Sequence, residues 1–143
     1  MTRSKSTARS RLLILDDDPI ISGFYKEVLE EQGYEVELVH RVSLLLNRIQ
    51  KDQAWDALVL DFMMPHADLP DLDYGQTDDG LLTGVFVVQK IKDLLSGVPI
   101  MILTNRRLAD VLGYLKNLIS PEDIKSKFEF PPEEFARFLR QRL

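Results

Sequence analysis

The stretch Ala57–Pro65 reads Ala-Leu-Val-Leu-Asp-Phe-Met-Met-Pro, an apolar run that stops at a single acid, Asp61. Four consecutive apolar residues are typical of a parallel strand that helices cover on both faces. We therefore expect Asp61 at the carboxyl end of a buried strand. That end is the edge at which open α/β sheets bind their ligands.

A second apolar run stops in the same way. Leu12–Leu15 ends at three consecutive acids, Asp16, Asp17 and Asp18. If the two strands are parallel neighbours, these carboxylates meet Asp61 at one edge of the sheet. Crowded carboxylates repel one another and raise one another's pKa unless a hard divalent cation neutralises them. The pattern therefore predicts a magnesium site.

The composition narrows the class of protein. The chain has 143 residues, 45% of them hydrophobic and 29% charged, which suits one globular domain. Its net charge of −5 argues against binding nucleic acid, because such binding needs Lys and Arg to neutralise phosphates. The absence of cysteine fits a reducing compartment, and no apolar run is long enough to span a bilayer. We expect a cytoplasmic protein with no nucleic-acid and no membrane partner.

Strand and helix patterns alternate along the chain after a polar, basic start. Residues 1–10 are expected to be a disordered tail and residues 11–143 the domain. The expected strands are Leu12–Leu15, Tyr34–Val39, Ala57–Leu60, Ile100–Leu103 and Ile124–Phe128. The expected helices are Pro19–Gln32, Val42–Lys51, Leu81–Leu95, Leu108–Ile119 and one that opens at Pro131–Glu134. Such alternation implies right-handed crossovers and a parallel sheet.

The first helix has clear boundary signals. Asp18 is expected to cap its amino end, with Pro19 at the first position, and Gly33 to end it in the left-handed conformation. Its inward face is expected to hold Ile20, Ile21, Phe24, Val28 and Leu29.

Together these motifs resemble the receiver domain of two-component response regulators, the CheY-like family, from Leu12 to Leu143. Leu-Leu-Ile-Leu-Asp-Asp-Asp-Pro is similar to the family's first strand and acidic pair, and Asp61 with Phe-Met-Met-Pro is similar to its Asp-x-x-Met-Pro motif. The resemblance implies a single flavodoxin-like α/β domain, with a doubly wound five-stranded parallel sheet of strand order 2-1-3-4-5.

The resemblance also implies a metal site. Asp16, Asp17 and Asp61 would bind Mg²⁺ together with the backbone carbonyl of Met63, and Asp17 is the expected direct ligand. Asp61 would be the phosphoacceptor. A carboxylate that attacks a phosphoryl group needs both charges screened, and a magnesium ion with a lysine does this.

Two further residues complete the expected site. Thr104 follows the fourth strand and resembles the Ser/Thr that hydrogen-bonds the phosphoryl group, while Lys127 resembles the Lys that pairs with it. The family usually has Pro after that Lys, whereas this chain has Phe128, so Lys125 stays an alternative. The family's switch aromatic corresponds to Ile124, which leaves signalling by rotation of an aromatic ring at this position in question.

The connection after Pro65 is longer than is usual in the family, and residues 66–83 form the expected insertion. Its acids are Asp68, Asp71, Asp73, Asp78 and Asp79. Two interpretations of this insertion are possible: it forms an acidic lid or partner-recognition loop, or it is an insertion that the fold tolerates without a function. A calcium loop is disfavoured, because the twelfth position counted from Asp71 is Leu82 rather than an acid.

The expected function is that of a stand-alone receiver in a phosphorelay, because the chain ends directly after its last helix. It would take a phosphoryl group from a histidine kinase or phosphotransfer protein and signal through a downstream protein partner. Such a receiver is not an enzyme in the ordinary sense, since it promotes its own phosphorylation and dephosphorylation. The alternatives are a pseudo-receiver that works without phosphorylation, and a haloacid-dehalogenase-like phosphohydrolase. The latter would need an acid where this chain has Met63.

Overall fold

The computed structural model describes residues 10–61, 81–105 and 108–143. Strands and helices alternate along the chain. The strands are β1 (Arg11–Leu15), β2 (Glu35–Val39), β3 (Ala57–Leu60), β4 (Ile100–Thr104) and β5 (Ile124–Ser126). The helices are α1 (Pro19–Glu31), α2 (Val42–Lys51), α3 (Leu81–Leu94), α4 (Leu108–Leu115) and α5 (Pro132–Arg142), and a 3₁₀ turn, η2 (Pro121–Asp123), precedes β5.

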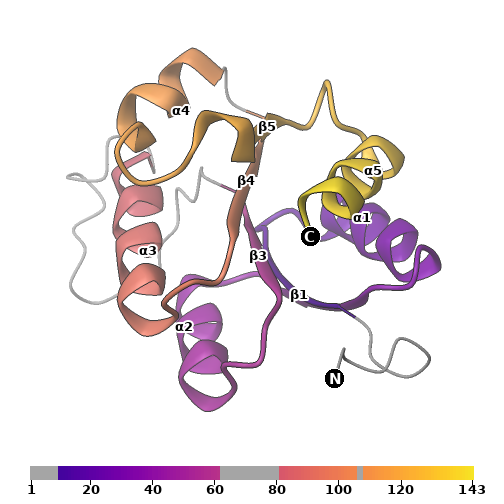
Figure 1. Ribbon diagram of the computed structural model, residues 1–143, viewed down its shortest axis with the longest axis horizontal. Helices are drawn as coiled ribbons and strands as arrows, with labels where there is room; N and C mark the ends of the chain where they lie inside the picture. The colour runs from indigo at the N-terminus through magenta and orange to yellow at the C-terminus, as the bar shows by residue number, and fades with distance from the viewer. Residues whose placement is uncertain (1–9, 62–80, 106–107) are drawn as a thin grey trace.

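The strands form one five-stranded sheet in the order β2-β1-β3-β4-β5, and every neighbouring pair is parallel. Helices α1 and α5 lie together on one side of the sheet, and α2, α3 and α4 lie on the other (Figure 1). The predicted α/β fold, with its strand order 2-1-3-4-5, is confirmed.

The two faces of the sheet belong to two separate apolar cores. Successive residues of a strand point to opposite faces. Leu13 and Leu15 of β1 therefore join the core beneath α2, α3 and α4, whereas Leu12 and Ile14 join the core beneath α1 and α5. Burial of both faces explains why Leu12–Leu15 of β1 and all of β3 are continuously apolar.

Helix α1 begins at the predicted Pro19 and ends one residue before the predicted Gln32, but it turns a different face inward. Asp18 accepts hydrogen bonds from the first free amides of the helix, and Gly33 follows its end with a φ of 98°. The buried residues of α1 are Ser22, Tyr25 and Leu29. Ile20 is 70% exposed and Phe24 56% exposed, so the prediction that they face the core is wrong.

Tyr25 explains the rotation of α1. Its hydroxyl donates a 2.7 Å hydrogen bond to the carbonyl of Phe130, and its ring lies edge-on to Phe135 of α5, with the ring centroids 6.0 Å apart. Tyr25 packs against α5, while Ile20, Ile21 and Phe24 of the same helix lie at the surface. The patch formed by Ile20, Ile21 and Phe24 is called the α1 patch below.

Two elements end at least two residues earlier than predicted. Helix α4 ends at Leu115, not Ile119, because the chain turns there: the amides of Leu118 and Ile119 both donate to the carbonyl of Leu115. Strand β5 ends at Ser126, whose side chain and carbonyl accept hydrogen bonds from the following turn. Lys127 therefore lies just beyond the strand.

Some predicted features lie outside the described residues. They are the basic tail up to residue 9, Met63, and residues 66–80 of the insertion. Residues 81–83 belong to the first turn of α3. Among the helices that the structure describes, none is long and apolar enough to cross a membrane.

Candidate functional site

Three carboxylates gather at the carboxyl edge of the sheet. Strands β1 and β3 are parallel neighbours with Leu15 opposite Leu60, so the residues that follow them lie side by side. The amide of Asp61 donates to the carbonyl of Leu15 at 2.8 Å. One carboxylate oxygen from each of Asp16, Asp17 and Asp61 lies within 4.8 Å of the other two. The expected meeting of these acids is confirmed.

Asp16 is held by several hydrogen bonds, and it is 4% exposed. Its amide donates to the carbonyl of Val39 at 3.1 Å, which continues the pairing of β1 with β2. Its Oδ1 accepts from the amide of Asp18 at 2.9 Å, and its Oδ2 from Lys127 Nζ at 2.6 Å. Buried carboxylates persist only when they are paired and hydrogen-bonded in this way.

Lys127 reaches the acids from beyond β5. Its Nζ lies 2.6 Å from Asp16 Oδ2 and 3.5 Å from Asp61 Oδ2, and its side chain is 5% exposed. Its amide donates to the carbonyl of Thr104 at 2.8 Å, so the pairing of β4 with β5 positions it. Burial lowers the pKa of Lys127, but Asp61 and Asp16 outweigh burial and hold the pKa above its ordinary value. Lys127 is therefore a cation between two acids.

Lys125, the alternative lysine, points elsewhere. Its Nζ lies 4.8 Å from the ring centroid of Phe130 and 4.8 Å from that of Phe138, where it makes cation–π contacts. These rings pack against the core under α1 and α5. The two lysines sit two residues apart, so the early end of β5 decides which of them faces the acids. Phe128, which replaces the usual Pro, is 80% exposed.

Asp17 differs from its neighbours because its side chain is exposed. Partial burial, followed by the repulsion from Asp16, raises the pKa of Asp17 above its ordinary value. A cation at this edge would relieve that repulsion. The three carboxylates supply the hard oxygen ligands that Mg²⁺ requires, so the residues present fit the ion.

The pairing of β4 with β5 positions Thr104 and Ile124. Thr104 ends β4, opposite Ser126, and is fully buried at the same edge as the acids. Ile124 is 3% exposed and packs in the core beneath α2, α3 and α4. An aliphatic side chain therefore fills the position that the resemblance predicted for the family's switch aromatic.

His40 is a site residue that sequence reasoning missed. It follows β2 directly, and its Nδ1 lies 2.8 Å from the carbonyl oxygen of Asp16. The sequence feature that could have indicated this role is the position of His40 at the end of the strand that pairs with β1.

The acids adjoin a cavity too small for a substrate. It has a volume of about 10 Å³ and is lined by Asp16, Asp61, Ser22 and Tyr25 among others, so it has room for at most one water. Burial and the nearby Asp16 raise the pKa of Tyr25 to about 12, so this phenol stays protonated.

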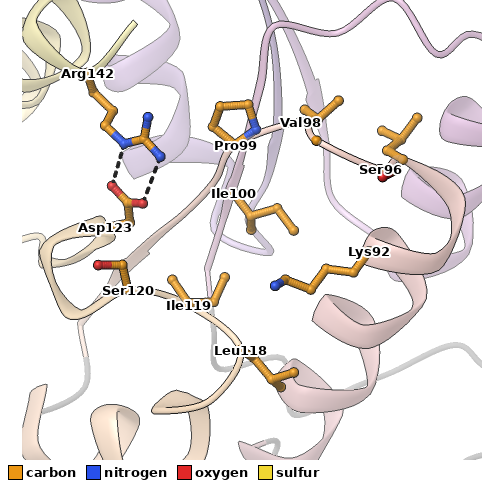
Figure 2. A pocket seen from close by; sticks show the side chains of 12 residues that line it. Lys92, Ser96, Val98, Pro99, Ile100, Leu118, Ile119, Ser120, Asp123 and Arg142 are labelled. Carbon is orange, nitrogen blue, oxygen red and sulfur yellow. Dashed lines mark hydrogen bonds and ion pairs between the residues drawn. The ribbon is translucent and has the colours of Figure 1, made fainter.

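A larger cavity of about 540 Å³ lies at the opposite edge of the sheet. Figure 2 shows it between the start of β4 and the Asp123–Arg142 ion pair, with Lys92 reaching in from α3. The Nε–Oδ1 and Nη2–Oδ2 distances of that pair are 2.9 and 3.1 Å. Ile100 begins β4 and lines the cavity, whereas Thr104 ends β4 beside the acids, so the cavity is separate from the acidic site.

Comparison with known proteins agrees with this geometry. The family model for the response regulator receiver domain matches residues 12–117. Response regulator MprA of Mycobacterium avium (strain 104) is 33% identical over 96 residues, 67% of this chain and 35% of the relative. MprA of Mycobacterium tuberculosis (strain ATCC 25618 / H37Rv) has the same identity and coverage. The chain thus spans about a third of the length of these relatives.

Solved structures show the same fold. The CheY-like receiver domain protein of Methanospirillum hungatei JF-1 superimposes with a TM-score of 0.71 at 21% identity, covering 94% of each chain. The chemotaxis response regulator CheY4 of Vibrio cholerae gives a TM-score of 0.70 at 21% identity, covering 95% of this chain and 100% of the other. With its acids gathered where the family places them, the chain belongs to the response regulator receiver domains, the signalling modules of two-component systems.

Proposed function

We propose that this receiver accepts a phosphoryl group on Asp61 from the phosphohistidine of a histidine kinase or phosphotransfer protein, with Mg²⁺, and signals by binding a protein partner. The observation that carries the proposal is the meeting of Asp16, Asp17 and Asp61 with the buried Lys127 at one edge of the sheet. A strand-end carboxylate that also has a cation beside it is suited to phosphoryl transfer.

Each residue has a separate part in the transfer. An Asp61 carboxylate oxygen forms the bond to phosphorus while the phosphorus–nitrogen bond of the donor breaks and its electron pair returns to the imidazole. Asp16 and Asp17 would hold Mg²⁺ with Asp61, and the bound ion would neutralise charge on the phosphoryl oxygens. Lys127, 3.5 Å from Asp61, would pair with the same oxygens, and the Thr104 hydroxyl would donate to one of them.

The surface beside the acids supports a protein donor. Among the described residues, the cavity that adjoins the acids has room for at most one water, so a donor would meet the carboxylates from outside. The α1 patch begins two residues after Asp18, the cap that follows the acidic pair, and exposes Ile20, Ile21 and Phe24. Contiguous exposed apolar side chains mark protein contacts. A helical donor resting on α1 would place its phosphohistidine over Asp61.

The test is the intact mass of the full chain after incubation with Mg²⁺ and acetyl phosphate. We expect one added phosphoryl group in the wild type and none in Asp61→Asn, which keeps the shape of the side chain. Thr104→Ala and Lys127→Ala should slow the reaction without abolishing it, because neither forms the bond.

Phosphorylation-independent binding is the second candidate. It is favoured by the aliphatic Ile124 at the switch position and by the exposed Phe128 after Lys127. A wild type that stays unmodified with acetyl phosphate and with phosphorylated kinases would make this pseudo-receiver reading the better account.

A further inference from the structure

His40 lies at the acidic edge of the sheet with one ring nitrogen engaged. Its Nδ1 is 2.8 Å from the carbonyl oxygen of Asp16. A carbonyl oxygen can only accept, so Nδ1 must carry the proton and donate it. The Asp16 carbonyl thus selects the tautomer of the His40 ring. The His40 side chain as a whole is exposed, so the bond leaves part of the ring open to solvent.

This bond completes the set of contacts that hold Asp16. The amide of Asp16 donates to Val39, and its carboxylate accepts from the amide of Asp18 and from Lys127. His40 supplies the donor for the carbonyl, the last polar group of the residue. Asp16 is thereby held in one orientation by β2, by the α1 cap and by the segment after β5.

The carbonyl of Asp16 matters because of the residue that follows it. The Asp16 carbonyl and the Asp17 amide belong to one planar peptide group. A donor fixed on that carbonyl therefore sets the plane from which the Asp17 side chain departs. The Asp17 carboxylate needs this restraint, since it lies within 4.8 Å of two other acids and their repulsion favours its moving away.

We propose that His40 is a positioning residue for the divalent-cation site: its Nδ1–H holds the Asp16–Asp17 peptide so that the Asp17 carboxylate stays beside Asp16 and Asp61. The inference rests on the proposed function, because it assumes that these acids bind magnesium. Residues that orient metal ligands from behind change metal affinity without touching the ion.

The test compares two substitutions of nearly equal size in the full chain. Asn places its side-chain amide nitrogen where His has Nδ1 and keeps the donor, whereas Leu fills the same space without one. Magnesium affinity is measured by isothermal titration calorimetry on the wild type and both variants under the same conditions. We expect His40→Leu to weaken magnesium binding about five- to tenfold, and His40→Asn to stay within about twofold of the wild type.

The outcomes separate this inference from the proposed function. A wild type that binds no magnesium contradicts the proposed function itself. Equal magnesium affinity in the wild type and in His40→Leu overturns only the positioning role. This holds even if His40→Leu unfolds at a lower temperature, because the hydrogen bond would then only stabilise the contact between β2 and β1. Equal weakening in both variants also overturns it, since the donor would not be what matters.

A spectroscopic measurement on the magnesium-free wild type checks the bond directly. Nitrogen-15 NMR of the imidazole rings reports which ring nitrogen carries the proton. The chain has two histidines, so a His66→Asn variant assigns the spectrum. We expect the neutral His40 ring to carry its proton on Nδ1. A ring protonated at Nε2 alone would show that it cannot donate to Asp16, and would overturn the proposal.

Discussion

Lys127 is the residue on which the charge balance of the acidic edge depends. Its side chain and that of Asp16 are each 5% exposed, and Asp61 lies 3.5 Å from its Nζ. Removing one partner of a buried ion pair leaves an uncompensated charge, which costs about 3 to 5 kcal/mol. We expect Lys127→Met to lower the free energy of unfolding of the magnesium-free protein by about 3 kcal/mol in urea denaturation.

Lys125→Met is the matched control, because this lysine sits two residues away and contacts aromatic rings instead of acids. Its loss should cost about 1 kcal/mol, the range of a cation–π contact. Saturating magnesium should restore part of the stability of Lys127→Met and little of that of Lys125→Met. If Lys125→Met is the more damaging change, Lys127 is not the residue that neutralises the acids.

Asp17 should give the magnesium affinity its pH dependence. Its pKa is raised by partial burial and by Asp16, and the ion binds the ionised form. Affinity should therefore be constant near neutral pH and fall as the pH drops through the raised pKa, before an ordinary Asp would protonate. Calorimetric titrations across the acid range check this, and Asp17→Asn should bind magnesium weakly at every pH.

The same raised pKa has the opposite effect on the stability of the magnesium-free protein: magnesium affinity falls as the pH drops, whereas the contribution of Asp17 to folding falls as the pH rises. The folded protein holds the Asp17 proton more tightly than the unfolded chain does. Asp17 therefore favours folding below its ordinary pKa and loses that contribution as the pH rises through the raised value. At neutral pH, Asp17→Asn should raise the Tm of the magnesium-free protein by about 2 °C, because relief of an exposed like-charge contact contributes about 0.5 kcal/mol. A lower Tm would contradict this account.

At the scale of one element, the two sides of α1 have different roles: one packs in the core and the other is exposed at the surface. Its inner side packs on α5 through Tyr25, and its outer side carries the α1 patch. We expect Phe24→Ser and Ile20→Ser to change the free energy of unfolding by less than about 0.5 kcal/mol, as exposed substitutions do. Both should slow phosphotransfer from a histidine kinase that phosphorylates the wild type, because the proposed protein donor would rest on this surface.

Phosphorylation by acetyl phosphate provides the internal control for α1, since a small donor needs no docking surface. Its rate should be unchanged in both variants. Leu44→Ser on α2, where the side chain is 50% exposed, is the matched surface change and should leave both rates unchanged. Equal slowing with the kinase and with acetyl phosphate would mean that the α1 changes disturb the acids rather than the docking of a partner.

For the whole molecule, magnesium binding and folding should be linked. The three acids come from segments that are distant in sequence, so the unfolded chain has no such site. A ligand that binds only the folded state at 100 times its Kd stabilises that state by about 2.7 kcal/mol. Thermal unfolding should therefore show a Tm higher by roughly 5 to 10 °C with saturating magnesium than with EDTA. Asp17→Asn should lose most of this increase, and an unchanged wild-type Tm would contradict the metal site.

The sequence by itself determined the architecture and the meeting of the acids. Apolar runs such as Leu58–Leu60 are a local property, and burial on both faces is the reason for them. Parallel strands end at one edge, so Asp16 and Asp61 had to meet once β1 and β3 were neighbours. The helix-capping role of Asp18 was equally readable, because capping involves only residues close in sequence.

Only the tertiary structure decided which side chains lie beside the acids at the carboxyl edge of the sheet. The turn at Ser126 ends β5 and directs Lys127, not Lys125, to the acids. Tyr25 sets the rotation of α1 through its contacts with residues more than 100 positions away, which no local apolar pattern records. His40 faces Asp16 only because β2 pairs with β1. Local patterns specify the strands, the helices and their caps, whereas contacts between distant segments select the side chains that face one another.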